Sequence, residues 1–336
     1  HNAQITTIDG FCSYIIRNYF HMVELDPGYR TAEEGELKLL KEDVMKELLE
    51  EAYEKADPKF LSLVECYASG KSDDEIRDMV YKLYNAAMSH PFPEEWLEEC
   101  MEVYRVETVR ELRETTWFQL LWETLDEKVI QAEMLAESAV KLCREPDGPY
   151  FYEEALADDL NFWNKVRKCR EADDYDEMAE LLAGHTFAKL PAKRDSSVNS
   201  VKKEQAKELR DEEKEICKEL VTKFFNQKEE ILLELIACAR EPLEGLVELT
   251  LKFKEAFSAK KREKNLLDFT DMEHFALRIL VEKVDGKLIP TQAARELSEK
   301  YEEVMVDEYQ DSNFVQELIT TMVSGWVSKR KNIFMV

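Results

Sequence analysis

The feature that most constrains the fold is the stretch from residue 23 to residue 263, which is rich in Glu, Lys, Leu and Ala. Gly and Pro occur in it almost only as breaks between segments. Apolar residues return at helical spacing in two clear series: Leu37, Leu40, Val44, Leu48 and Leu49, then Trp117, Leu120, Leu121, Leu125 and Ile130. This pattern predicts a large helical domain in which these stripes form the core.

A different pattern stands at residues 302 to 314, "EEVMVDEYQDSNF". Its apolar run, Val304 to Val306, is continuous rather than alternating, which indicates a strand of a parallel sheet covered on both faces. The string "NIFMV" at 332 to 336 indicates a second buried strand. Ligands of open α/β sheets bind at the carboxyl ends of the strands, so Asp307 and Glu308 are expected to lie at a binding site.

Two adjacent acids at such a position suit phosphate chemistry. Mg²⁺ prefers oxygen ligands and keeps several waters, which is the role predicted for Asp307. The next carboxylate, Glu308, can orient or deprotonate an attacking water. The alternative is that these acids form a solvated turn after a strand, with Asp311 and Ser312 capping the helix that follows.

The string "VDEYQDSN" resembles the Walker B motif of the UvrD/Rep-type superfamily-1 DNA helicases. "TTIDGFCSYIIRNYF" at 6 to 20 resembles the Thr-x-His-x-Phe-Cys motif of that family, and "NLLDFTDMEHFALRIL" at 265 to 280 resembles its Asp-Phe-x-Asp-Leu segment. Residues 20 to 51 and 83 to 99 resemble the AddA (RexA) family of bacterial AddAB helicase-nuclease subunits. The resemblance covers most of the chain and departs at Asp9, where many relatives carry His.

The resemblance implies a mainly α fold: a large helical insertion attached to part of a parallel-sheet α/β motor domain of the RecA-like, P-loop NTPase kind. The implied motor-domain pieces are residues 1 to 22 and 264 to 336, and the implied insertion, of the 1B type, is residues 23 to 263. The implied cofactors of the intact parent are ATP and Mg²⁺, with Asp307 and Gln310 at the nucleotide and Asp307 on the metal. The implied strand contacts are Thr7 and Phe11, where stacking of a base would suit the Phe11 ring.

The function implied by the resemblance is that of an ATP-dependent DNA helicase with 3'-5' translocation and exonuclease activity, acting in double-strand break repair and recombination. The implied partners are single-stranded DNA, a duplex end and an AddB-type second subunit. The sequence itself lacks a Walker A motif: "ASGKSDDE" at 68 to 75 has a Gly-Lys-Ser end, but Glu65 stands where the first glycine belongs. This piece alone is therefore expected to be inactive.

Charge argues against strong DNA binding by the chain alone. It carries 46 basic and 72 acidic residues, a net charge of −26, and such a field repels phosphates. Two stretches, 192 to 210 and 252 to 264, are locally basic. The first predicts a duplex contact through Lys193, Arg194, Lys202 and Lys203. The second is the reserve candidate, through Lys260, Lys261 and Arg262. The alternative for both stretches is a solvated helix face.

The remaining residue types add little chemistry. The seven cysteines form no Cys-x-x-Cys pair, which fits a reducing, cytoplasmic setting, and no apolar run is long enough to span a membrane. The five histidines form no zinc-binding pair, and the acids beside His274, Asp271 and Glu273, are expected on a helix surface. The competing hypothesis is a non-catalytic, acidic helical interaction domain. A complete magnesium-dependent hydrolase would need further converging acids that no second motif supplies.

Overall fold

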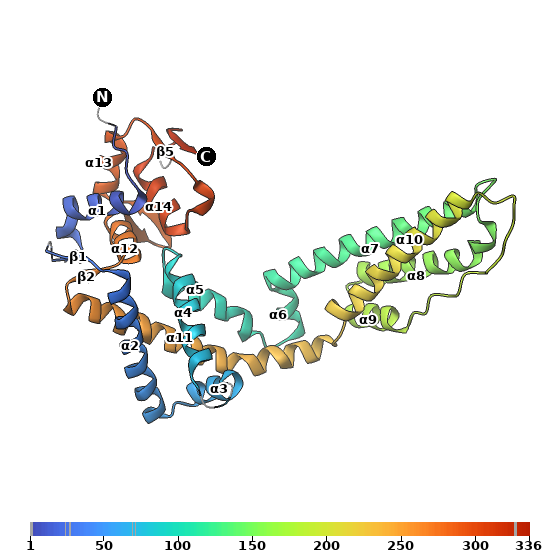
Figure 1. Cartoon of the computed structure of the whole chain (residues 1–336), viewed down its shortest axis with the longest axis horizontal. Helices are drawn as coiled ribbons and strands as arrows, with labels where there is room; N and C mark the ends of the chain where they lie inside the picture. Colours follow the sequence, from blue (N-terminus) through green and yellow to red (C-terminus); the bar gives the residue numbers. More distant parts are fainter. Residues whose placement is uncertain (1–2, 24, 27, 69, 71, 326–327) are drawn as a thin grey trace. The chain divides into compact units, whose positions relative to one another are not determined.

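The computed structural model describes the whole chain except residues 1–2, 24, 27, 69, 71 and 326–327 (Figure 1). The described part is mostly helical, as predicted, with three two-stranded sheets. It forms two compact units, one of residues 1–102 with 240–336 and one of residues 103–239. The domain limits predicted from the sequence, at residues 22 and 263, stay a prediction.

The unit of residues 1–102 and 240–336 is built from helices of both sequence segments. Its helices are α1 (Ile8–Tyr19), α2 (Glu34–Lys55), α3 (Pro58–Tyr67), α4 (Asp74–Met88), α5 (Pro93–Glu102), the later part of α11 (Glu229–Glu263), α12 (Phe269–Leu280), α13 (Gln292–Lys300) and α14 (Phe314–Val323). Two 3-10 turns, η1 (Phe20–Met22) and η5 (Tyr309–Asp311), complete it.

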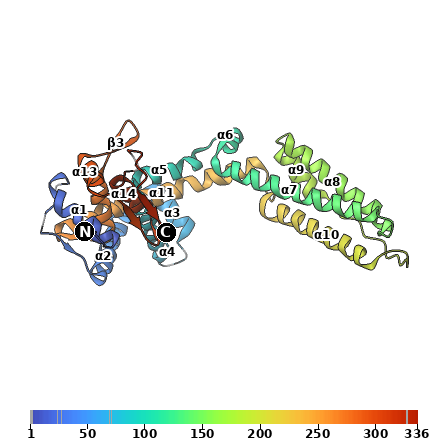
Figure 2. The ribbon, with the colours of Figure 1, turned by 90° about the horizontal axis from the view of Figure 1, so that it is seen from above.

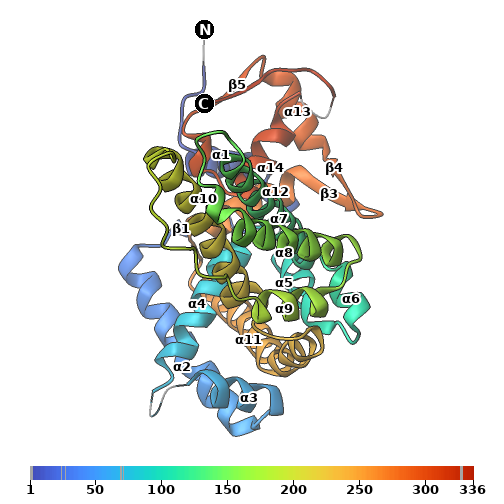
Figure 3. The same cartoon turned by 90° about the vertical axis from the view of Figure 1, so that its right-hand side faces the viewer.

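The described sheets all belong to this unit. Strand β1 (Arg30–Thr31) pairs in parallel with β2 (Leu266–Leu267), and β5 (Val304–Val306) pairs in parallel with β6 (Ile333–Met335). Strands β3 (Val281–Val284) and β4 (Lys287–Pro290) form an antiparallel hairpin next to α13 (Figure 3). The turn residues Asp285 and Gly286 have φ of 50° and 74°, the left-handed pair that a tight type I′ hairpin turn requires.

The strands predicted at 304 to 306 and 332 to 336 are confirmed, the second as Ile333–Met335, and the structure pairs the two in parallel. The expectation that both faces are covered is wrong. Met305 is 72% exposed and Phe334, its partner across the pair, is 52% exposed. Among the described strands β5 pairs only with β6, so the middle side chains of this two-stranded pair lie in solvent.

Two apolar cores hold this unit together. One joins α1, α12, α13 and α14 around Ile15, Ala276 and Ile319. The other joins α2, α3, α4 and the later part of α11 around Val44 and Phe253, and it contains most of the stripe predicted from residue 37 to residue 49.

Helices α3 and α11 approach very closely at a glycine. A Cβ atom on Gly245 would lie 2.4 Å from the backbone oxygen of Lys59. The Lys59 ammonium also meets the carboxylates of Glu244 and Glu248, at 3.0 and 2.6 Å. Only glycine permits this distance, because any side chain at residue 245 would collide with the α3 backbone.

The unit of residues 103–239 is a helical bundle in which α7, α8 and α10 lie side by side (Figure 2). Its elements are η2 (Val103–Arg105), α6 (Val109–Glu114), α7 (Thr116–Cys143), η3 (Tyr150–Tyr152), α8 (Glu153–Glu171), α9 (Tyr175–Gly184), α10 (Ser200–Glu219), the π-helical turn η4 (Leu220–Phe224) and the first part of α11. The core surrounds Trp163, Tyr175 and Leu125.

The predicted stripe from residue 117 to residue 130 is only partly in this core. Leu125 is fully buried, and Trp117 and Leu121 pack against the core, whereas Leu120 and Ile130 are 58% and 44% exposed. Periodicity marks a broad apolar face on α7. Helices α8 and α10 cover only part of that face.

A charged cluster is buried inside the same bundle. The Arg210 Nε donates to Asp159 Oδ2 at 2.6 Å, and both side chains are almost fully buried. Glu213 is fully buried beside them, and its two oxygens have no hydrogen-bond donor among the described residues. Burial, followed by the Asp159 carboxylate, raises the pKa of Glu213 to about 8. The raised pKa favours the protonated carboxyl, the form that suits a buried acid next to the Asp159 carboxylate.

We expect the stability of the chain to fall as the pH rises from about 5 to about 8, because of Glu213. Its native pKa lies above the usual 4.5, so the native state keeps a proton that the unfolded chain loses in this range. The measurement is the thermal midpoint by far-UV circular dichroism at several pH values. Glu213→Gln should flatten this dependence, whereas Glu212→Gln, an exposed control one residue away, should not. Equal pH profiles for the wild type and Glu213→Gln would contradict the assignment.

Candidate functional site

Three of the predicted site residues lie together directly after β5. Asp307 and Glu308 are exposed at the carboxyl end of the strand. The Glu308 backbone N–H donates to Asp307 Oδ1 at 3.1 Å, and the Gln310 side-chain amide donates to the Glu308 carboxylate. The Asp307 carboxylate therefore remains open to a ligand, whereas Gln310 holds the Glu308 carboxylate in place.

The backbone at Glu308 has an unusual conformation. Its φ of 53° lies in the left-handed region, which a non-glycine residue enters only at a cost. The turn is fixed on both sides, because the Tyr309 N–H donates to the Val336 oxygen at 2.8 Å and the Asp311 N–H donates to the Glu308 oxygen at 2.9 Å. Strain of this kind concentrates at functional sites, where the surroundings hold it in place.

Helix α14 begins immediately after this turn, at a reciprocal capping box. The Gln316 N–H donates to Asn313 Oδ1 at 2.8 Å, and the Asn313 N–H donates to the Gln316 side chain at 3.4 Å. The prediction that Asp311 and Ser312 cap this helix is wrong. Residues 309 to 311 form the 3-10 turn η5, so the helix starts later and Asn313 takes the cap.

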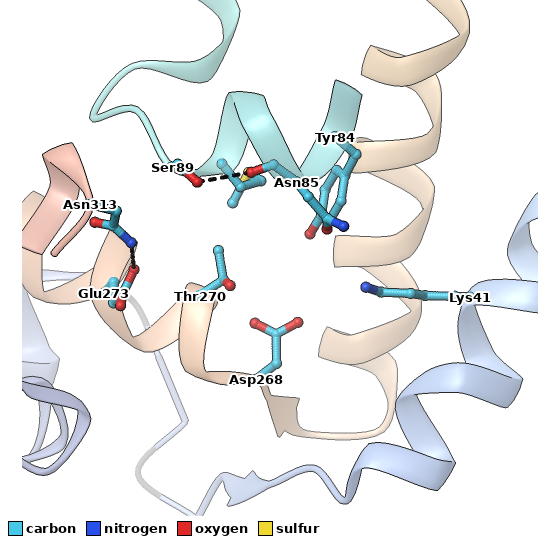
Figure 4. Close-up of a pocket in the computed structure, with 9 residues that line it drawn as sticks. Lys41, Tyr84, Asn85, Ser89, Asp268, Thr270, Glu273 and Asn313 are labelled. Carbon is cyan, nitrogen blue, oxygen red and sulfur yellow. Dashed lines mark hydrogen bonds between the residues drawn. The ribbon is translucent and has the colours of Figure 1, made fainter. Parts of the chain in front are cut away.

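Glu273 of α12 joins the "DFTD" segment to this cap. Its carboxylate accepts from Asn313 Nδ2 at 3.1 Å (Figure 4). It also accepts from Gln316 Nε2 at 2.5 Å. Glu273 is 5% exposed, so the expectation of a surface position is wrong. Burial raises the pKa of Glu273, and Asp9 near the start of α1 adds to the rise. No local signal in the sequence marks this residue, because its partners lie 40 and 43 positions away.

A buried lysine neutralises the two acids at the start of α12. Asp268 and Asp271 form the reciprocal cap of this helix, and the Lys261 ammonium lies 2.8 Å from one and 2.6 Å from the other. Lys261 is 2% exposed. The reserve prediction that Lys261 contacts DNA is therefore wrong, and Asp271 is not on a helix surface either. Lys260 is half-exposed, with Glu47 at 3.7 Å.

A polar cavity of about 260 Å³ lies between α4, α12 and the start of α14. Figure 4 shows the side chains of Lys41, Thr270 and Asp268 directed toward it. Burial lowers the pKa of Lys41. No pattern in the sequence predicts this cavity, because its lining comes from segments that are distant in the chain.

Thr7 and Phe11 lie at the start of α1. The Thr7 hydroxyl caps the helix by accepting from the Gly10 N–H at 3.2 Å. The half-buried Phe11 ring packs against Tyr14 and Tyr301, with centroids 6.3 and 6.0 Å away. These contacts give both residues a structural role, and their contact with DNA stays a prediction.

The four basic residues predicted to contact a duplex lie in the other compact unit, near η3. Lys193 donates to the Tyr150 hydroxyl at 2.6 Å, and Lys203 donates to the Lys193 backbone oxygen at 3.1 Å. Lys202 is engaged by Glu145, at 2.5 Å, and by Asp147. Arg194 is exposed. Lys193, Arg194 and Lys203 are thus better available to a ligand than Lys202, whose charge is already neutralised.

Two structural findings bear on the other predicted roles. In the part of the chain that the structure describes, no helix is both long and apolar enough to cross a membrane. The same residues contain no group of three His, Cys, Asp or Glu side chains that could hold a metal ion alone.

Similarity to known proteins identifies the family. The UvrD/REP helicase N-terminal domain model matches residues 1–336. A relative from Lachnoclostridium phytofermentans, named as an ATP-dependent helicase/nuclease subunit, is 42% identical over 100% of this chain and 24% of its own length. Proteins of the same name from Bacillus pumilus and Clostridium perfringens are 35% and 36% identical over 99% of the chain and 27% and 26% of their lengths.

The chain thus spans about a quarter of the length of the curated relatives it matches. The family match runs through all three stretches that resemble helicase motifs, including the acids after β5. The resemblance inferred from the sequence is confirmed. The family match implies a P-loop NTPase type of fold. The chain belongs to the UvrD/REP helicase N-terminal domain family.

Proposed function

We propose that this chain is the part of an ATP-dependent DNA helicase/nuclease subunit that carries its magnesium-binding and water-activating acids. The observation that carries the proposal is the exposed pair Asp307 and Glu308 at the carboxyl end of β5, with Glu308 in a left-handed backbone and bonded to Gln310. The experiment that tests it compares DNA-stimulated ATP hydrolysis by the complete subunit with that of its Glu308→Gln variant.

Each residue of this group has a distinct role. Asp307 would hold Mg²⁺ through a hard carboxylate oxygen, and the ion would supply positive charge that offsets the charge of the ATP phosphates. Glu308 accepts a proton from the attacking water. Gln310 holds the Glu308 carboxylate in one orientation and contacts the nucleotide.

The DNA-facing part of the proposal rests on other residues. Thr7 and Phe11 contact the translocating strand, and the helical insertion from 23 to 263 lies beside the duplex. The complete subunit translocates 3'-5', carries an exonuclease, pairs with an AddB-type protein and acts in double-strand break repair in the cytoplasm. The shared name of the relatives, which describes an ATP-dependent helicase/nuclease, supports the helicase and nuclease assignments.

We expect the basic residues near η3 to set the salt dependence of duplex binding. Changing Lys193, Arg194, Lys202 and Lys203 to Ala in the complete subunit should flatten the plot of log K against log salt by about three, because each lost phosphate contact releases one counterion fewer. Lys202 should add little, since Glu145 and Asp147 already bind it. ATP hydrolysis at saturating DNA should change little.

The control for this titration is a variant with four exposed or half-exposed lysines of the same compact unit changed to Ala: Lys168, Lys214, Lys218 and Lys228. It removes a similar charge from other positions of the bundle. A slope that both variants change equally, or that neither changes, would favour the solvated-face interpretation of residues 192 to 210.

A further inference from the structure

Three aromatic rings form a continuous stack beside the polar cavity. The His90 ring lies 4.3 Å from Trp96 at an interplanar angle of 13°, and 4.8 Å from Phe314 at 25°. His90 lies between α4 and α5, Trp96 lies on α5, and Phe314 is the first residue of α14. Phe314 ends the stack and is 57% exposed. An exposed ring that is supported from behind is a ready platform for another flat group.

The stack adjoins the cavity along two segments of the chain. Ser89 and Asn313, which line the cavity, directly precede His90 and Phe314 in the chain. Asn85 and Thr270 add amide and hydroxyl groups to the wall (Figure 4). A ligand that lies on Phe314 is therefore close to hydrogen-bonding groups of the cavity wall.

The charge of the cavity restricts its occupant. The carboxylates of Asp268 and Glu273 line it, with Asp271 directly behind Asp268, against the two ammonium groups of Lys41 in the lining and Lys261 behind it. This balance disfavours a phosphate and favours a neutral group that donates hydrogen bonds. A nucleobase with an exocyclic amino group has this edge together with a flat π-face, and bases of single strands commonly stack on aromatic side chains.

We propose that Phe314, supported by His90 and Trp96, stacks one base of single-stranded DNA whose amino-bearing edge enters the polar cavity. The inference rests on the proposed function, since it assumes that the complete subunit binds DNA. It adds the location of a base next to the catalytic turn. Asn313, which precedes Phe314, caps α14 and binds Glu273. The stacked base and the turn of Asp307 and Glu308 therefore both lie at the N-terminal end of α14.

The test is equilibrium binding of oligo(dC) and oligo(dU) to the complete subunit by fluorescence anisotropy at one salt concentration. Cytosine presents an amino donor where uracil presents an oxygen, so the wild type should bind oligo(dC) more tightly. Phe314→Leu keeps an apolar side chain but removes the ring, and should weaken oligo(dC) binding by roughly five- to one-hundred-fold, the usual effect of losing one stacked base. Photocrosslinking with 5-iododeoxycytidine should mark the peptide that contains Phe314.

Phe269→Leu is the matched control. Phe269 is also 57% exposed and also the first residue of a helix, α12, but it is not part of the stack. Equal losses in the two variants, or none in Phe314→Leu, would overturn the platform. If DNA-stimulated ATP hydrolysis persists in that case, the proposed function still stands. A wild-type subunit that neither binds DNA nor hydrolyses ATP would overturn both.

Discussion

Replacing Glu308 by Gln in the complete subunit is expected to lower ATP hydrolysis by roughly two to four decades while ATP binding changes little, because a positioned general base contributes about this much. Gln keeps the size of the side chain but cannot take a proton from water. Asp307 remains to bind Mg²⁺, so the nucleotide should still be held. DNA unwinding should fall with hydrolysis.

The measurement pairs steady-state hydrolysis with equilibrium binding of a fluorescent ATP analogue. Glu303→Gln is the control, since Glu303 is an exposed acid just before β5. Gln310→Ala should lower hydrolysis less than Glu308→Gln, because Gln310 orients the Glu308 carboxylate but does not itself take the proton. Hydrolysis by Glu308→Gln at the wild-type rate would make the acid structural and remove the assigned role.

Features that depend on neighbouring residues could be predicted from the sequence. The run from Val304 to Val306 is a strand because continuous apolar residues end there in polar ones, and the acids after it lie at its carboxyl end. The stripe from Leu40 to Leu49 is buried because helical spacing places it on one face of α2. Asp285-Gly286 between two short strands is a usable hairpin signal, although the hairpin was not among the predictions.

Features that depend on packing between distant segments could not be predicted. Lys260, Lys261 and Arg262 are consecutive basic residues, and nothing local distinguishes the buried one from its neighbours. Lys261 is buried because the end of α11 lies against the start of α12, where two capping carboxylates need a cation. Glu273 is similar, since its role depends on the capping residues of α14, which are 40 and 43 positions away.

The free energy of unfolding should therefore fall by about 3 to 5 kcal/mol in Lys261→Met, the usual cost of removing one partner from a buried ion pair. The variant leaves Asp268 and Asp271 mostly buried and close together without the Lys261 ammonium. Urea unfolding of the chain, followed by far-UV circular dichroism, measures the change. Lys260→Met, which loses only an exposed pair with Glu47 at 3.7 Å, should cost less than about 1 kcal/mol.

A double-mutant cycle separates lost charge pairing from lost packing in Lys261→Met. Adding Asp271→Asn removes one of the two uncompensated carboxylates, so the pair of changes should cost less than the sum of the single changes. The Asn side chain can still accept from the Asp268 N–H, which keeps the reciprocal cap of α12. Two outcomes would contradict this: additive losses of unfolding free energy in the cycle, or a Lys261→Met variant as stable as Lys260→Met. Either would mean that the contact of the Lys261 ammonium with Asp268 and Asp271 does not stabilise the start of α12.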